Sequence, residues 1–160
     1  MMTQEQSQEI WSLIKDIEVA VLTTQSGDGL RARPMYQAQK KFDGTMWFLT
    51  SDESAKTCEL NENQQVCLAY AEPKKGVFVS MLGTAGFIKD RALIKKFWNS
   101  AAAAWIDGNG GSKELTLLEV HIEQAEAWDS KTNAMKRLFE TVRSGLTDSE
   151  PVYRENRKYG

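Results

Sequence analysis

Hydrophobic and polar positions alternate with a period of two along most of this chain, which is the pattern of half-buried β-strands. Strands are expected at residues 19–24, 30–40, 45–50, 66–71, 76–89, 115–122 and 125–128. Glycine-containing turns at 25–29 and 43–44 separate the first three strands. We therefore predict that these three strands are consecutive antiparallel neighbours.

Helical spacing is confined to four segments. Thr3 and Gln6 form a capping-box pattern ahead of an apolar face that includes Ile10 and Ile14. Further helices are expected near 54–62, from Asp90 through residue 101, and over 133–144. The helix that begins at Asp90 would carry Leu93, Ile94, Phe97, Trp98 and Ala101 on one side, and Trp98 and Trp105 would share that face as core residues.

Strands outnumber helices and are mostly joined by short turns, so we predict a mainly β fold. The expected architecture is an antiparallel sheet closed into a small barrel, with peripheral helices. Residues 1–160 are interpreted as a single domain with a core over about 10–145 and a polar, loosely ordered tail at 146–160. Gly83 and Gly86, inside a long strand, predict a bulge or a close backbone approach.

Charge and composition narrow the functional classes. The net charge of −2 and the pI near 5.5 provide no basic field for nucleic acid or anionic membrane. The segment 1–6 lacks the features of a signal peptide, and no apolar run approaches the length of a membrane span. A cytoplasmic location is therefore expected.

Two cysteines and one histidine leave little room for a metal or thiolate centre. Cys58 and Cys67 form no CxxC motif, so reduced and buried thiols are expected and no metal site is assigned. His121 lies on a predicted strand with no GxSxG sequence elsewhere, which favours a structural role over a nucleophile triad.

The first candidate site lies where the strand 45–50 passes into the helix expected after it. Thr50, Ser51 and Ser54 offer hydroxyl groups there, and Lys56 adds a cation in the first turn. Backbone N–H groups at the start of a helix complete a plausible phosphate site. The alternative is ordinary helix capping with Lys56 in water.

The second candidate site is the pair Arg33-Pro34. Proline cannot donate to a β ladder, so we expect the strand to be interrupted at Pro34. The interruption would free backbone groups for a planar heterocycle, while Arg33 could bind a phosphate. An edge strand with solvated arginines is the alternative.

Five segments follow one another in a specific order: VAVLTTQSGDGLRARPM (19–35), FDGTMWFLTSDESAK (42–56), FVSMLGTAGFIKDR (78–91), FWNSAAAAW (97–105) and AEAWDS (125–130). Together they resemble the general stress protein 26-like branch of the pyridoxamine 5′-phosphate oxidase-like family, whose members are FMN-binding split barrels. The resemblance covers roughly residues 10–145. It implies an antiparallel split β-barrel that binds FMN between the two subunits of a homodimer.

The resemblance also assigns the phosphate-binding positions. Thr50, Ser54 and Lys56 match the family's motif where the third strand meets the following helix, and Ser51 lies in the same stretch. Ala55 stands where the oxidases have an arginine. This difference, together with Ala38 in place of a strand lysine, implies weaker FMN binding and makes FAD or another flavin an alternative cofactor.

A second set of positions follows from the same resemblance. Arg33 matches the arginine that opens the flavin-binding strand of the oxidases, with Pro34 and Met35 beside it as in the stress proteins. Ala38 replaces a strand lysine. The oxidases' C-terminal Trp and Arg segment is not present, which argues against pyridoxamine phosphate oxidation.

Three functions are consistent with these residues. The first is a flavin-dependent oxidoreductase of an unknown small molecule, with the redox chemistry carried by the flavin and no catalytic side chain assigned. The second is a non-catalytic module that stores or senses flavin. The third is a split barrel adapted to haem or a deazaflavin, and the single histidine gives haem ligation little support.

Overall fold

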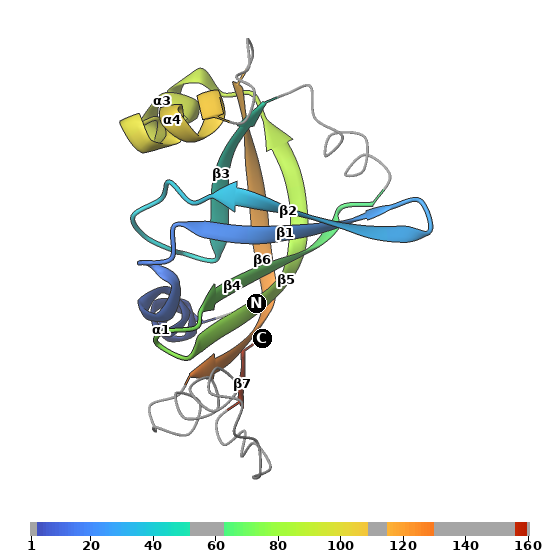
Figure 1. The fold of residues 1–160 in the computed structure, drawn as a ribbon, viewed down its shortest axis with the longest axis vertical. Coiled ribbons are helices and arrows are strands. Elements are labelled where there is room, and N and C mark those ends of the chain that lie inside the picture. Colours follow the sequence, from blue (N-terminus) through green and yellow to red (C-terminus); the bar gives the residue numbers. More distant parts are fainter. Residues whose placement is uncertain (1–2, 52–62, 109–114, 130–155, 160) are drawn as a thin grey trace, which may run out of the picture.

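An antiparallel sheet organises the part of the chain that the computed structural model describes, which is residues 3–51, 63–108, 115–129 and 156–159 (Figure 1). Its strands follow the path β2-β1-β4-β5-β6-β3, and β7 pairs with β6. The elements are α1 (Gln4–Ile14), β1 (Val19–Ser26), β2 (Gly29–Tyr36), β3 (Thr45–Ser51), β4 (Gln65–Glu72), β5 (Val77–Ile88), α3 (Arg91–Phe97), α4 (Ser100–Gly108), β6 (Leu115–Asp129) and β7 (Asn156–Tyr159).

The predicted capping box opens α1. The Thr3 hydroxyl accepts a hydrogen bond from the backbone N–H of Gln6, and the Gln6 side chain accepts one from the N–H of Thr3. These bonds satisfy donors that a helix start otherwise leaves unpaired. Ile10 and Ile14 are fully buried, so the apolar face of α1 packs on the sheet as predicted.

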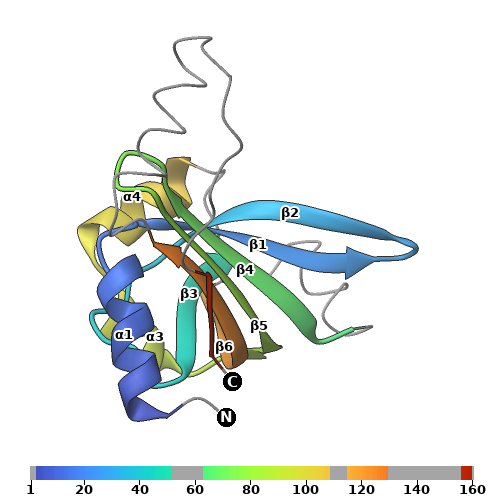
Figure 2. The same cartoon turned by 90° about the horizontal axis from the view of Figure 1, so that it is seen from below.

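Strands β1 and β2 form the predicted hairpin, whose tip projects beyond the rest of the sheet in both views (Figures 1 and 2). Gly27, with φ +57°, occupies the left-handed region at the turn, where glycine avoids the clash of a Cβ. The prediction for β3 was wrong. Along its length β3 pairs with β6 and not with β2. In the strand order β2 and β3 are therefore the two end strands of the sheet.

Strands β4, β5 and β6 form the middle of the sheet through continuous antiparallel pairing. The register between β5 and β6 shifts between Leu82 and Gly83, which confirms the predicted irregularity. A Cβ placed on Gly83 would lie 2.1 Å from the carbonyl oxygen of His121. The strand needs glycine here because two backbones approach too closely for a side chain.

Two groups of buried side chains hold the fold together. The larger one fills the inner side of the curved sheet under α1, and includes Leu22, Phe48, Leu68, Met81 and Val120. The smaller one lies between β3 and the helices α3 and α4, around Leu49, Ala102, Ile106 and Leu117. Figure 1 accordingly shows α1 at one end of the barrel and α3 with α4 at the other.

The long helix expected from Asp90 is two helices. Asp90 caps α3 as predicted, since its carboxylate accepts from the N–H groups of Ala92 and Leu93. Trp98 then adopts an extended conformation, and the Asn99 side chain accepts from the N–H of Ala102 to open α4. Trp98 is 43% exposed and does not share a helix face with Trp105, so its assignment to the core was also wrong.

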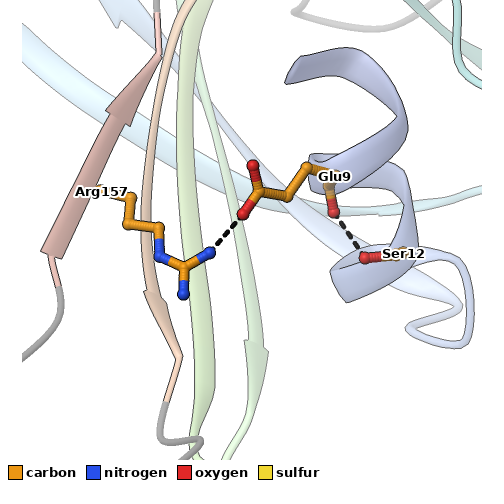
Figure 3. Close-up of polar contacts among 3 residues, drawn as sticks. All are labelled: Glu9, Ser12 and Arg157. Atoms are coloured by element: carbon orange, nitrogen blue, oxygen red, sulfur yellow. Dashed lines mark hydrogen bonds and ion pairs between the residues drawn. The ribbon is translucent and has the colours of Figure 1, made fainter. Parts of the chain in front are cut away.

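The C-terminal segment is not a loose tail over its last residues. Residues 156–159 form β7 along β6, and Tyr159 is buried in the main core. Arg157 makes an ion pair with Glu9 of α1, and the backbone carbonyl of Glu9 accepts a hydrogen bond from Ser12 (Figure 3). The expected helices near 54–62 and at 133–144 lie outside the described residues.

Candidate functional site

The two end strands of the sheet meet along a seam. Gln37, just beyond β2, forms an isolated antiparallel bridge with Phe48 of β3, and β2 and β3 contact each other. The backbone N–H of Trp47 also donates to the Gln39 side chain, 2.7 Å away. These contacts bring the ends of the open sheet together and close the barrel at one point.

Counting outwards from this bridge places the predicted residues on opposite sides of the seam. In an antiparallel register that aligns Gln37 with Phe48, Met35 faces Thr50 and Pro34 faces Ser51. Met35 and Thr50 are both buried, so they lie on the inner side of the sheet. The structure thus brings together two segments that the sequence separates.

Pro34 explains why the seam stays open. The expected interruption at Pro34 was wrong, because β2 pairs with β1 continuously and Pro34 lies opposite Val21. The backbone N–H of Gln37 donates to the carbonyl of Glu18, next to β1. Backbone groups of successive strand residues point to opposite edges, so those of Pro34, three positions earlier, point away from β1 and towards β3. Since proline has no N–H, a full ladder between β2 and β3 would lack a donor there.

Arg33 supplies the positive charge at this end of the seam. Its side chain is half-buried, and Nη2 donates to the hydroxyl of Thr24 at 2.6 Å. Thr24 is almost fully buried on β1 and belongs to the same inner face as Leu22. The guanidinium is therefore held on the inner side of the sheet and is not a freely solvated edge arginine.

Three of the predicted positions cannot be placed as fully. Ser54 and Lys56 lie outside the described residues. Ser51 ends β3, and its side chain is not described. The phosphate-binding part of the predicted site therefore stays a prediction, whereas the positions of Arg33, Pro34, Met35 and Thr50 in the sheet are defined.

His121 belongs to a separate group on the surface. Its Nδ1 lies 3.1 Å from the hydroxyl of Thr45, its direct neighbour across β3 and β6, and Nε2 lies 3.6 Å from the carboxylate of Glu119. The side chain is 61% exposed. The arrangement links neighbouring strands, and none of its residues lines the cavity described below.

Other chemical groups are few in the described residues. Cys67 is a free, half-buried thiol with Sγ 3.5 Å from the Ser80 hydroxyl, and Cys58 lies outside this part. Over residues 3–51, 63–108, 115–129 and 156–159, no three His, Cys, Asp or Glu side chains are grouped to hold a metal. The same residues include no helix long and apolar enough to cross a membrane.

The family of this protein follows from its sequence match. The family described as pyridoxamine 5′-phosphate oxidase like matches residues 5–152. The chain belongs to this family. The match spans α1, the whole sheet path and both sides of the seam, and the observed antiparallel split barrel agrees with it.

Solved structures and a curated relative extend the comparison. The general stress FMN/FAD binding protein of Xanthomonas citri is 26% identical with a TM-score of 0.67, over 81% of this chain and 92% of that one. A protein of Clostridium acetobutylicum related to general stress protein 26 has the same TM-score at 16% identity, over 82% and 93% of the two chains. Protein bli-3 of Neurospora crassa is 26% identical over 108 residues, which are 62% of this chain and 52% of bli-3. The chain thus matches about half the length of that relative.

Proposed function

We propose that this protein binds FMN at the seam between β2 and β3. The observation that carries the proposal is the bridge between Gln37 and Phe48, which joins the ends of β2 and β3. Its register, extended along both strands, sets Pro34 and Met35 opposite Ser51 and Thr50. These segments are the ones assigned to the cofactor from the sequence. The general stress FMN/FAD binding protein of X. citri, similar in sequence and fold, supports the same ligand class.

The chemistry of the described side chains fits a flavin phosphate. Arg33 offers a half-buried guanidinium on the inner side of the sheet, and a charge-assisted bond to phosphate is strong in such a place. Thr50, buried on the facing strand, adds a hydroxyl. Lys56 and Ser54 complete the phosphate site in the proposal, and Met35, buried in the main core, supports the strand beside it.

The outer edge of β2 fits the heterocyclic ring. Pro34 leaves the seam without a continuous ladder, so neighbouring backbone groups are not committed to β3. A planar ring with its own donors and acceptors can pair with such groups. When bound, FMN supplies electron transfer, and the residues of this chain hold and orient it.

We further propose that the protein acts as a homodimer. The outer sides of neighbouring strands carry an exposed apolar row, in which Pro34 lies opposite Val21 and Val21 opposite Ala69. Leu82, 46% exposed, extends this surface on β5. A second copy of the chain would bury it.

Light scattering should report a dimer that Val21→Glu and Ala69→Glu weaken. A monomeric wild-type chain would contradict this assignment.

The deciding experiment is a titration of the purified full chain with FMN and, separately, with FAD, followed by flavin absorbance and fluorescence. We expect saturable FMN binding. Arg33→Ala should weaken it by about tenfold or more, because a charge-assisted hydrogen bond is lost. Arg91→Ala removes an equal charge from the exposed start of α3 and should leave the affinity unchanged.

Two further comparisons sharpen the result. An Arg33→Ala, Lys56→Ala double variant should lose FMN while its circular dichroism stays that of a folded β protein, and full retention of FMN would show that the site lies elsewhere. Reduction of the bound flavin by reduced nicotinamide then separates an oxidoreductase from a storage or sensing module. Rapid bleaching indicates turnover, whereas a flavin that stays oxidised with every donor tried indicates storage or sensing.

A further inference from the structure

A cavity of about 390 Å³ lies beside the barrel, between the loop that follows β2 and the junction of α3 with α4. Its lining includes Gln39 and Lys40 from the loop, Trp47 from β3, and Trp98 and Asn99 from the junction. Arg33, Pro34, Met35 and Thr50 are not among the lining residues. The volume is within the range of small-molecule sites, which is about 300–1,000 Å³.

One wall of the cavity is held by a buried glutamine. Gln39 is 7% exposed, and its Nε2 donates to the carbonyl oxygens of Lys41 at 2.7 Å and Thr45 at 3.2 Å. Its Oε1 accepts from the N–H of Trp47 at 2.7 Å. Three bonds from one side chain fix the loop against β3, so this wall is pre-formed.

The other wall exists because the helix breaks. Trp98 leaves α3 in an extended conformation, and Asn99 caps α4. The Phe97 ring stacks on Trp47, with centroids 5.6 Å apart and an angle of 20° between the planes. The break thus places an exposed indole beside a fixed aromatic pair.

The charge around the cavity is positive. Lys40, Lys41 and Lys96 line it together with one carboxylate, Asp43. Within the described part of the chain, none of these four groups forms an ion pair. Lys96 Nζ lies 5.7 Å from the centre of the Phe97 ring, which sets its ammonium group against the aromatic wall.

We propose that this cavity is a second ligand site, which takes a planar aromatic carboxylate. The aromatic walls stack against a ring, and the lysines attract the carboxylate. The cavity adjoins the closed end of the seam, because Gln39 and Trp47 belong to both, and its lining does not include Arg33, Pro34, Met35 or Thr50. On the proposed function, FMN occupies those four positions, so we expect the second ligand to bind while FMN is bound.

The test is isothermal titration calorimetry of the full chain with three probes. 2-Naphthoate carries both features, 2-naphthamide has the same rings without the charge, and cyclohexanecarboxylate has the charge without the rings. We expect 2-naphthoate to bind about tenfold more tightly than either control, because each lacks one of the two contributions. Equal affinities for naphthoate and naphthamide would overturn the proposal, as would no binding of naphthoate.

Variants and amide NMR locate the site. Lys40→Gln, Lys41→Gln and Lys96→Gln combined should remove the preference for naphthoate over naphthamide, while Lys15→Gln, Lys74→Gln and Lys75→Gln, an equal charge change on other surfaces, should keep it. Signals of residues 38–43 and 97–99, and the indole N–H of Trp47, should shift with naphthoate. Shifts confined to the outer side of β1 and β4, or loss of preference in the control triple variant, would refute the assignment.

The titration is repeated with saturating FMN. An unchanged naphthoate affinity supports two separate sites, and competition between the ligands overturns the second site. If the chain binds no FMN, the proposed flavin function fails, and the naphthoate titrations still decide the cavity by themselves.

Discussion

Arg157 on β7 forms an ion pair with Glu9 on α1, although 148 positions of sequence separate them. The pair ties the last described strand to the first helix (Figure 3). Tyr159, two residues further on, is buried in the main core beside this contact. The last described strand is therefore packed against α1 and the main core.

The ion pair should contribute modestly to stability. Both side chains are a little over one third exposed, so solvent screens the interaction. A double-mutant cycle with Glu9→Gln and Arg157→Gln should give a coupling energy of about 0.5–1 kcal/mol by urea unfolding. The same cycle on Lys75 and Asp16, 3.8 Å apart and about two-thirds exposed, should give a value near zero. Equal couplings for the two pairs would contradict this ranking.

Gly83→Ala should be strongly destabilising, by about 2–4 kcal/mol, because the added Cβ would overlap the carbonyl of His121 on the neighbouring strand. Gly86→Ala is the matched control. There the nearest atom lies 3.9 Å away at the end of the Glu119 side chain, which can move. Thermal and urea unfolding of both variants test the prediction, and similar losses at the two glycines would show that the close approach is not the cause.

Gln39→Met should loosen the loop after β2. The substitution keeps the side chain's length but leaves the N–H of Trp47 and the carbonyls of Lys41 and Thr45 without this partner. The expected cost is about 2–4 kcal/mol. Hydrogen exchange at the Trp47 amide should accelerate together with the loss of stability. Gln8→Met, at an exposed position of α1, should change neither quantity.

Stability should fall at alkaline pH because of Tyr70. Burial raises the pKa of this phenol well above its ordinary value, and its hydroxyl donates to Gln37 at 2.7 Å. Above about pH 10 the unfolded chain loses the proton and the folded chain keeps it, so the free energy of unfolding decreases by about 1.4 kcal/mol per pH unit for this group. Below that pH the contribution is fully present.

Tyr70→Phe provides the comparison for this pH effect. The variant should be less stable at neutral pH, because the side-chain oxygen Oε1 of Gln37 loses its donor. It should also show a shallower decline in stability above pH 10 than the wild type. Burial also raises the pKa of Tyr159, so part of the decline should persist. Parallel slopes for the two proteins in urea unfolding at several pH values would rule out Tyr70 as a source.

Local features of the fold could be predicted from the sequence because neighbouring residues determine them. The capping box at Thr3, the hairpin turn at Gly27 and the close approach at Gly83 depend on a few positions each, and all three are present. The mainly β antiparallel barrel could be predicted for a related reason. Short turns and period-two patterns favour antiparallel pairing whichever strands become neighbours.

Long-range pairing could not be predicted in the same way. The alternation of apolar and polar residues in β3 is compatible with pairing to β2 or to β6. The pairing with β6 depends on the packing of the whole sheet, which the local pattern does not contain. The apolar periodicity runs on through Trp98 and predicts one continuous helix. Only Asn99, a residue that often caps helices, indicates that a new helix starts there. β7 lies in a segment rich in charged residues, which has no alternating apolar pattern, so the sequence did not predict that Tyr159 is buried.

The candidate site stays a prediction from sequence motifs. The structure adds the places of Arg33 and Met35 on β2 and of Thr50 on β3, and the bridge between Gln37 and Phe48 that joins the ends of these strands was not foreseen. The cavity at the junction of α3 and α4 was missed altogether. Its residues come from a loop, a strand and a helix break, and no local pattern connects them.

The pairing of β3 with β6 also determines when the barrel can close. Thr45 to Ser51 leave the ribosome long before their partner, which begins at Leu115. Until β6 is synthesised, the segment that contains Met46, Phe48 and Leu49 has no partner strand. In the same period β1 with β2, and then β4 with β5, can already form hairpins. The nascent chain thus carries an unpaired apolar segment from the synthesis of β3 until that of β6, and the barrel can close only after β6 has been made.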